Sequence, residues 1–293
     1  MNIVNILPRH TNFEPLTASS ISLVARDLVR CSRFQNTTTM VCREIDDYFD
    51  GFRVRTFAGG PTRQTRNQVL SIIADLKPDL IVMHQNVLTA AAIAAQFPDV
   101  PLLVHKHNYI KHSKGLKRYI HHRRYRNLAG IIFVSEALRA DFAQHNPNAR
   151  PGLFVVHNGL PLADWPGDAE KSKEIVAVGM VEEKKGSLEI AKALARVLPE
   201  FPDWRARFVG AFTTAPGYAD RMKREIAGCA QISSSGFVPF SQAMAATNTA
   251  RIAIVNSRNE PFGRVAIEAF AARTALICAQ SGGLGEVIAD AAL

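Results

Sequence analysis

Short apolar runs alternate with helical patterns along the whole chain, and this alternation limits the fold more than any other feature. Runs rich in Val, Ile and Leu are typical of strands buried in a parallel sheet, and the amphipathic segments between them are typical of helices that cover it. We expect strands at residues 2–7, 38–42, 80–84, 101–105, 130–134 and 153–157, and then at 174–179, 205–210, 231–236, 251–256 and 275–279. We expect helices at residues 19–33, 65–76, 89–96 and 136–144, and then at 187–198, 219–228, 241–247 and 263–273. The sequence therefore predicts an α/β fold.

A segment rich in Pro, Gly and Asp separates the two series of elements. It runs from His157 to Asp168, and such residues interrupt periodic structure. We expect a first domain at residues 1–160, a linker at 161–167 and a second domain at 168–293. The alternation of strands and helices in each half predicts a doubly wound, Rossmann-like domain. We expect the two domains to face a cleft, with ligands near the carboxyl ends of the strands.

Several classes of protein are disfavoured by what the sequence lacks. The four cysteines are scattered and form no Cys-x-x-Cys pair, which argues against a disulfide framework or a zinc site. There is no P-loop, no Gly-x-Gly-x-x-Gly after the first strand, no His-Glu-x-x-His, no Gly-x-Ser-x-Gly and no Asp-x-Asp. Neither a basic leader nor an apolar run of about 18 residues is present. We expect a cytoplasmic protein.

Positive charge is concentrated in one segment, residues 106–126, which holds eight Lys or Arg residues and no acid. Removing these eight charges from the formal net charge of +9 leaves +1 for the rest of the chain. A local basic face points to an anionic partner, although a solvated helix is the usual explanation of a charge run. Its tyrosines suit a membrane interface, so we expect the inner face of a membrane or an anionic acceptor as the partner. The candidate residues for this face are Lys111, Lys114, Lys117, Arg118, Arg123 and Arg124.

The strongest chemical motif is Asn-Glu260-Pro-Phe-Gly-Arg-Val-Ala-Ile-Glu268-Ala. Carboxylates accept strong hydrogen bonds from hydroxyl groups. A spacing of eight residues returns to one helical face, so we expect both carboxylates to point at one ligand. Gly263 would begin the helix, where backbone N–H groups favour a phosphate. An isolated pair of acids would more often be a helix cap and a solvated side chain.

The motif resembles the Glu-x7-Glu signature of the family 4 retaining glycosyltransferases, known as glycosyltransferase group 1. The resemblance implies a GT-B fold and transfer of a sugar from a nucleotide-diphosphate donor to a glycan, lipid-linked or polysaccharide acceptor, as in polysaccharide or lipopolysaccharide biosynthesis. It implies that Glu260 contacts the donor sugar and Glu268 the nucleotide ribose, without a catalytic metal or other cofactor. The donor-binding residues by this resemblance are Gly179, Lys185, Glu260, Phe262, Gly263, Arg264, Glu268, Gly282 and Gly283.

A second segment, Val-Gly179-Met-Val-Glu-Glu-Lys-Lys185-Gly, is similar to the family's Val-Gly-Arg-Leu-x-x-x-Lys-Gly. Lys185 falls on the Lys that neutralises the diphosphate, but Met180 replaces the Arg. Lys184 and Arg264 are the two candidates to supply the missing charge. The Ser-Gly282-Gly283 turn resembles the family's Gly-Gly-x-x-Glu turn, whose amides approach the donor.

The first half resembles the family more loosely. The segment Leu-Val-His105-Lys-His107-Asn lies where the family carries a His close to the transferred sugar. His107 is the better match, and His105 is the alternative. We therefore expect His107, Lys185 and Glu260 to be the catalytic residues.

Two departures from the family keep other functions open. Met180 is the first, and the second is the end of the chain at Leu293, where similar enzymes continue through another strand and a helix. We therefore expect a shortened second domain. The alternative function is a degenerate GT-B protein that binds a nucleotide sugar or a partner without turnover. An RNA-binding protein is the third, least favoured, reading of the basic segment, and we do not expect nucleic acid as a partner.

Overall fold

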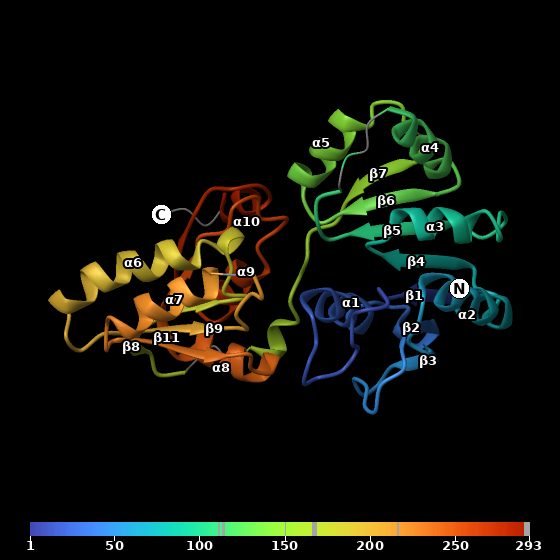
Figure 1. The fold of residues 1–293 in the computed structure, drawn as a ribbon. Coiled ribbons are helices and arrows are strands. Elements are labelled where there is room, and N and C mark those ends of the chain that lie inside the picture. Colours follow the sequence, from blue (N-terminus) through green and yellow to red (C-terminus); the bar gives the residue numbers. More distant parts are fainter. Residues whose placement is uncertain (111, 113–114, 150, 166–168, 216, 290–293) are drawn as a thin grey trace. The chain divides into compact units, whose positions relative to one another are not determined.

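Two parallel β-sheets, each flanked by helices, make up the protein (Figure 1). The structure is a computed structural model that describes all residues except 111, 113–114, 150, 166–168, 216 and 290–293, and it does not describe the side chains of residues 117 and 118. The chain divides into two compact units, Met1–Gly159 and Leu160–Leu293.

The first unit is built on a sheet with the strand order β3-β2-β1-β4-β5-β6-β7, in which every neighbouring pair is parallel. The chain starts near the middle of this sheet and winds outward in both directions, as expected for a doubly wound domain. The interior strand β1 is buried along its whole length because helices cover both faces. The strands are β1 (Ile3–Ile6), β2 (Thr38–Arg43), β3 (Arg53–Phe57), β4 (Leu80–His84), β5 (Leu102–Lys106), β6 (Gly130–Phe133) and β7 (Gly152–Val155).

Helices of the first unit begin at polar caps that the sequence provides. The Ser19 hydroxyl accepts a hydrogen bond from the backbone N–H of Ser22, and Ser135 does the same for Leu138. Phe13, fully buried beside the first of these helices, packs edge-on against Phe49 and Phe52. The helices are α1 (Ser20–Arg30), α2 (Thr62–Leu76), α3 (Val87–Ala94), α4 (Gly115–Tyr125) and α5 (Glu136–His145), with a 3-10 turn η1 (Gln35–Thr37).

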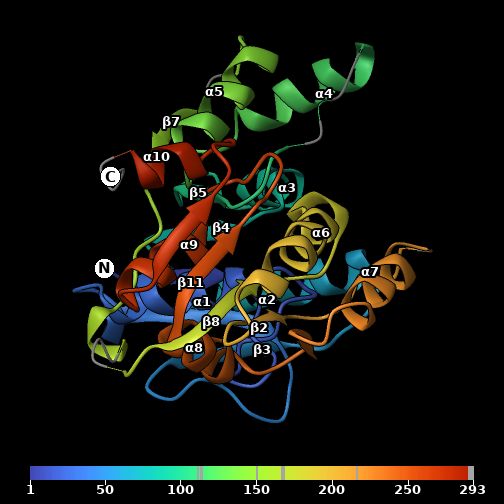
Figure 2. The ribbon, with the colours of Figure 1, turned by 90° about the vertical axis from the view of Figure 1, so that its left-hand side faces the viewer.

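The second unit contains a five-stranded parallel sheet with the order β10-β9-β8-β11-β12. Figure 2 shows β8 and β11 side by side within it. Its strands are β8 (Ser172–Val178), β9 (Arg205–Val209), β10 (Ile232–Gly236), β11 (Ala250–Val255) and β12 (Ala275–Cys278). Its helices are α6 (Ser187–Val197), α7 (Tyr218–Ala227), α8 (Phe240–Thr249), α9 (Arg264–Ala271) and α10 (Leu284–Ile288), with 3-10 turns η2 (Leu162–Asp164), η3 (Glu183–Lys185) and η4 (Leu198–Glu200).

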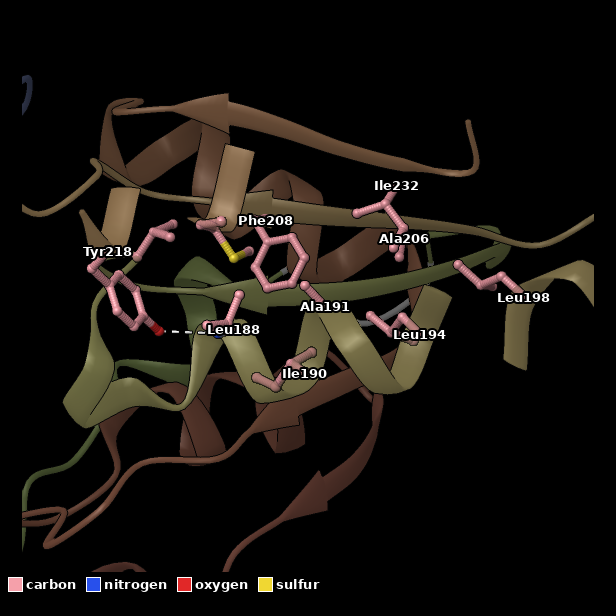
Figure 3. Packing of buried hydrophobic residues seen from close by; sticks show 11 residues of the cluster. Leu188, Ile190, Ala191, Leu194, Leu198, Ala206, Phe208, Tyr218 and Ile232 are labelled. Atoms are coloured by element: carbon pink, nitrogen blue, oxygen red, sulfur yellow. Dashed lines mark hydrogen bonds between the residues drawn. The ribbon is translucent and has the colours of Figure 1, made fainter. Parts of the chain in front are cut away.

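One face of this second sheet carries a large apolar core (Figure 3). Leu188 and Leu194 of α6 pack with Phe208 of β9, and each fully buried side chain of this size contributes about 1.5–3 kcal/mol. The Tyr218 hydroxyl at the start of α7 accepts a hydrogen bond from the backbone N–H of Leu188, 3.0 Å away. A second cluster, which includes Ala246 of α8 and Ala269 of α9, packs on the other face.

The expected strands are all present, with ends displaced by one or two residues. Three elements, β3, α4 and α10, were not predicted. β3 is an edge strand of the sheet and is mostly exposed, so it lacks the apolar run of a buried strand. Within the expected linker, Trp165 is buried and packs edge-on against Phe240 of α8. Residues 166–167 of that linker lie outside the described residues.

Candidate functional site

An ion pair joins two of the predicted catalytic residues in the second unit. Lys185 ends η3, which follows β8, and its Nζ lies 2.7 Å from Glu260 Oε2. Glu260 lies between β11 and α9 and is nearly buried. The two segments follow neighbouring parallel strands, whose carboxyl ends share one edge of the sheet, although 75 residues separate them in sequence.

Hydrogen bonds tie the Glu260 loop to the glycine turn that follows β12. The backbone N–H of Gly283 donates to the Glu260 carbonyl at 2.8 Å. The Ser281 hydroxyl donates to the Ser257 carbonyl at 2.5 Å and accepts from the Glu260 N–H at 3.5 Å. The loops after β8, β11 and β12 therefore form one polar site, which we call the carboxyl-edge site and define by Lys185, Glu260, Ser281 and Gly283. The sequence analysis did not identify Ser257 or Ser281 as part of it.

Glu268 lies on α9 and is paired with a cation of the same helix. Its Oε1 lies 2.7 Å from Arg264 Nε, and both side chains are less than a tenth exposed. The Arg264 guanidinium also lies over the ring of Phe240, 5.6 Å from its centroid. Glu260 precedes α9, which begins at Arg264, and that the two carboxylates point at one ligand stays a prediction.

Two glycines allow the loops of this site to approach each other closely. Gly186 has φ +62° and stands at the start of α6, where an added Cβ would lie 2.6 Å from the Asn256 carbonyl oxygen. Gly263 has φ +100° and precedes α9, where an added Cβ would lie 2.5 Å from Leu284 Cδ1. Gly263 thus stands at the start of the predicted helix, and Phe262 beside it is buried.

Around Met180, the cations that we considered as replacements for the missing Arg already have partners. Met180 is 49% exposed and follows Gly179, the last residue before the loop. Lys184 Nζ lies 3.1 Å from Glu182 Oε1 and is largely exposed, while Arg264 is held by Glu268. Lys185 is consequently the cation of this loop that reaches Glu260.

In the first unit, three histidines cluster at the carboxyl ends of β4 and β5. His84 pairs in register with His105, and His107 lies two residues further on. His84 Nδ1 and His107 Nε2 are 2.7 Å apart, and the two rings are stacked. His84 was not predicted as a site residue, although it ends the expected strand at residues 80–84, just as His105 ends the expected strand at residues 101–105.

Burial sets the charge of this histidine cluster. It lowers the pKa of His84 and His107 well below the usual value, with nearby positive charge as a smaller cause, and lowers the pKa of His105 to about 4. The three imidazoles are therefore neutral at pH 7. Lys106 Nζ donates to Gln85 Oε1 at 2.7 Å and to the Gln85 carbonyl at 3.2 Å, and burial lowers its pKa to about 8.

The described part of the basic segment lies mainly on α4. Arg123 and Arg124 are exposed, and Leu116, Tyr119 and Ile120 form an exposed apolar row beside them. Lys111 and Lys114 lie outside the described residues, and so do the side chains of Lys117 and Arg118. Among the helices that the structure describes, none has the length and hydropathy needed to cross a bilayer.

Family comparisons decide the class of protein that carries these features. The family "Glycosyl transferases group 1" matches residues 165–292, and "Glycosyltransferase Family 4" matches residues 39–164. The chain belongs to the group 1, family 4 glycosyltransferases. The carboxyl-edge site lies in the part of the chain matched by the first of these families.

Several curated glycosyltransferases are similar to this chain in sequence. "Glycogen synthase" of Mycobacterium tuberculosis (strain CDC 1551 / Oshkosh) is 29% identical over 227 residues, which cover 72% of this chain and 54% of that protein. "Alpha-maltose-1-phosphate synthase" of Mycolicibacterium smegmatis is 27% identical over 55% of this chain and 46% of that protein. "Lipopolysaccharide core biosynthesis mannosyltransferase LpcC" of Rhizobium leguminosarum is 31% identical over 46% and 42%. The chain spans about half the length of the curated relatives it matches.

Solved glycosyltransferase structures share the fold. A sucrose-phosphate synthase from Thermosynechococcus elongatus has a TM-score of 0.72 and 16% identity, covering 98% of this chain and 84% of that chain. The trehalose-6-phosphate synthase OtsA has a TM-score of 0.77 and 11% identity, covering 99% and 87%. The prediction of a GT-B type α/β fold with two Rossmann-like domains is confirmed.

Proposed function

We propose that this chain transfers a sugar from a nucleotide-diphosphate sugar to a glycan, lipid-linked or polysaccharide acceptor. The Lys185–Glu260 ion pair at the carboxyl edge of the second sheet is the observation that carries the proposal. A site that binds a sugar diphosphate needs a cation for the phosphates and a hydrogen-bond acceptor for the sugar hydroxyls. The pair supplies both within one site, next to the glycine turn at Gly283.

The proposed reaction retains the anomeric configuration and uses no metal. Lys185 and the backbone amides near Gly263 and Gly283 stabilise the negative charge that develops on the departing diphosphate. The sugar passes through an oxocarbenium-like transition state, and the acceptor hydroxyl attacks from the face that the diphosphate leaves. Metal independence is supported by the absence of an Asp-x-Asp motif from the sequence.

Three further roles complete this proposal. Glu260 orients the donor sugar, and Glu268 holds the nucleotide ribose while Arg264 fixes its carboxylate. His107 contacts the transferred sugar by family resemblance, in a neutral form suited to accept or donate one hydrogen bond.

Titration calorimetry with UDP-, GDP- and ADP-sugars in the presence of a chelator tests the donor site. We expect saturable binding of one nucleotide class, weakened about tenfold or more by Lys185→Ala because a charge-assisted hydrogen bond is lost. Glu268→Ala should weaken binding as well, whereas Lys192→Ala, at an exposed position on α6, should not. The donor site would be contradicted if the native chain and the three variants bound with equal affinity, or if the native chain bound none of the sugars.

Met180 favours a second candidate, a degenerate protein that binds the nucleotide sugar without turnover. A single lysine would hold the diphosphate without stabilising its departure. Hydrolysis of the bound donor distinguishes the two functions, because many transferases release sugar to water slowly when no acceptor is present. If only the Met180→Arg variant hydrolyses the donor, the native chain is a binding protein without turnover. If the native chain hydrolyses the donor, it is a transferase.

We also propose that α4 attaches the protein to an anionic membrane surface. Leu116, Tyr119 and Ile120 have the i, i+3, i+4 spacing of one helical face, and Leu116 is 74% exposed beside basic neighbours. Phosphatidylglycerol vesicles should bind the protein in low salt, and phosphatidylcholine vesicles should not. Leu116→Ser should reduce the bound fraction, while Leu162→Ser, an exposed leucine elsewhere, should not. Binding that ignores both lipid charge and Leu116→Ser would refute this attachment, and preferential binding to RNA would indicate a nucleic-acid surface instead.

A further inference from the structure

The parallel pairing of β4 with β5 gathers three imidazoles into one cluster. His84 and His105 are register partners, and His107, one residue past the end of β5, stacks on His84. One ring nitrogen from each histidine lies within 4.8 Å of those from the other two. None of the three rings belongs to the carboxyl-edge site, which lies in the other unit.

Two ring nitrogens of this cluster lack a hydrogen-bond partner. His84 Nε2 and His105 Nε2 make no hydrogen bond with any residue that the structure describes, and their side chains are 0% and 2% exposed. Buried polar atoms are almost always paired, so an unpartnered atom calls for an explanation such as a ligand. Two such atoms within one histidine cluster indicate a ligand that accepts several imidazole lone pairs at once.

The protonation state of the cluster suits such a ligand. Metal ions bind neutral imidazole, and burial lowers the pKa of all three histidines, so no proton has to be displaced at neutral pH. The ammonium of Lys106 faces away to Gln85 oxygens, although its charge still helps to lower the pKa of His107. No carboxylate belongs to the cluster among the described residues, which disfavours Mg²⁺ and Ca²⁺.

We propose that His84, His105 and His107 form a binding site for a divalent transition-metal ion, with Zn²⁺ as the best match. Three imidazoles are a common ligand set for Zn²⁺, and the fourth position is left to water or a small anion. Zn–N bonds are about 2.0–2.1 Å long, so modest side-chain rotations must bring the nitrogens closer together.

The site has a consequence for sugar transfer that rests on the proposed function. An ion held by His107 withdraws that side chain from the sugar, so Zn²⁺ should inhibit a reaction that itself needs no metal. Metal binding is measured without any substrate, so failure of the proposed transferase activity leaves the metal site testable.

Calorimetry with Zn²⁺ and visible absorption with Co²⁺ test the site, using the full chain without an added His tag. We expect one ion per chain, and His105→Gln should lower the affinity by more than about tenfold. The matched control is His145→Gln, because His112, Asp141 and His145 form a second, more exposed cluster, in which His112 Nε2 lies 3.0 Å from Asp141 Oδ2. Loss of binding in His145→Gln but not in His105→Gln would overturn the proposal.

A measurement on the native chain covers the case in which His105→Gln fails to fold. X-ray absorption of the Zn²⁺-loaded protein should show three imidazole nitrogens at about 2.0–2.1 Å and no sulfur. A sulfur ligand would assign the ion to a cysteine instead, and a carboxylate ligand with two imidazoles would assign it to the exposed cluster. Failure of the native chain to bind either Zn²⁺ or Co²⁺ would also overturn the site.

Discussion

The buried charge pair on α9 makes Glu268 a structural residue as well as a proposed ligand contact. We expect Glu268→Gln to lower the free energy of unfolding by about 3 kcal/mol, because it breaks a buried ion pair with Arg264. Glu189→Gln is the matched control, since Glu189 pairs with Arg258 where both side chains are about half exposed, and it should cost less than about 1 kcal/mol. Urea denaturation of the native chain and the two variants measures both changes in the free energy of unfolding. Equal losses in the two variants would show that the ion pair on α9 is solvated.

At Cys42, burial controls reactivity. The thiol is fully buried beside Leu7 and Phe13, and burial raises its pKa to about 12. The nucleophile is the thiolate, so only about one Cys42 in a thousand is reactive at pH 9. We expect iodoacetamide at pH 8–9 to modify the exposed Cys31 readily and Cys42 only after unfolding in guanidinium. Mass spectrometry of the digested protein measures both, and equal rates in the folded chain would contradict the burial of Cys42.

Single residues of the site were predictable only where a local motif marked them. Glu260, Lys185 and Gly263 could be chosen because Pro, Phe and Gly neighbours frame them in sequence. The contact between Lys185 and Glu260 was not predictable, because it depends on β8 and β11 being neighbours in the sheet. The same holds for Ser281, whose hydroxyl bridges two loops that are distant in sequence.

Among the elements, α6 depends on the glycine at its start. Gly186→Ala should lower the free energy of unfolding by about 3 kcal/mol, because it adds a left-handed alanine and a clash with the Asn256 carbonyl. Gly236 has nearly the same φ, +64°, with no atom within 4 Å of an added Cβ, so Gly236→Ala should cost only about 1 kcal/mol. Thermal or urea unfolding compares the two variants, and similar losses would show that the Asn256 loop yields without cost.

Elements were predictable in proportion to their burial. Well-buried strands, such as β1 and β2, consist mainly of apolar and β-branched residues. β3 escaped detection because arginines occupy two of its five positions. Basic residues dominate α4, so its segment was interpreted as a charged face and not assigned as a helix, and the five-residue α10 is too short to show a helical period.

At the scale of the whole molecule, each unit carries its own sheet and core, and the GT-B fold follows from that repetition. Length and composition alone left one or two domains open, and the change at residues 157–168 favoured two. The sequence could not reveal the order of strands within each sheet, because order depends on which apolar faces the helices cover.

The burial of Trp165 against Phe240 makes the chain spectroscopically asymmetric. Its two tryptophans, Trp165 and Trp204, both belong to the second unit, whereas four of the five tyrosines belong to the first. Indole emission during denaturation therefore follows the second unit, while far-ultraviolet circular dichroism follows both. A core substitution in the first unit, such as Phe13→Ala, should shift the dichroism curve and leave the emission curve in place if the units melt separately. Coincident shifts would instead reveal one cooperative melting unit.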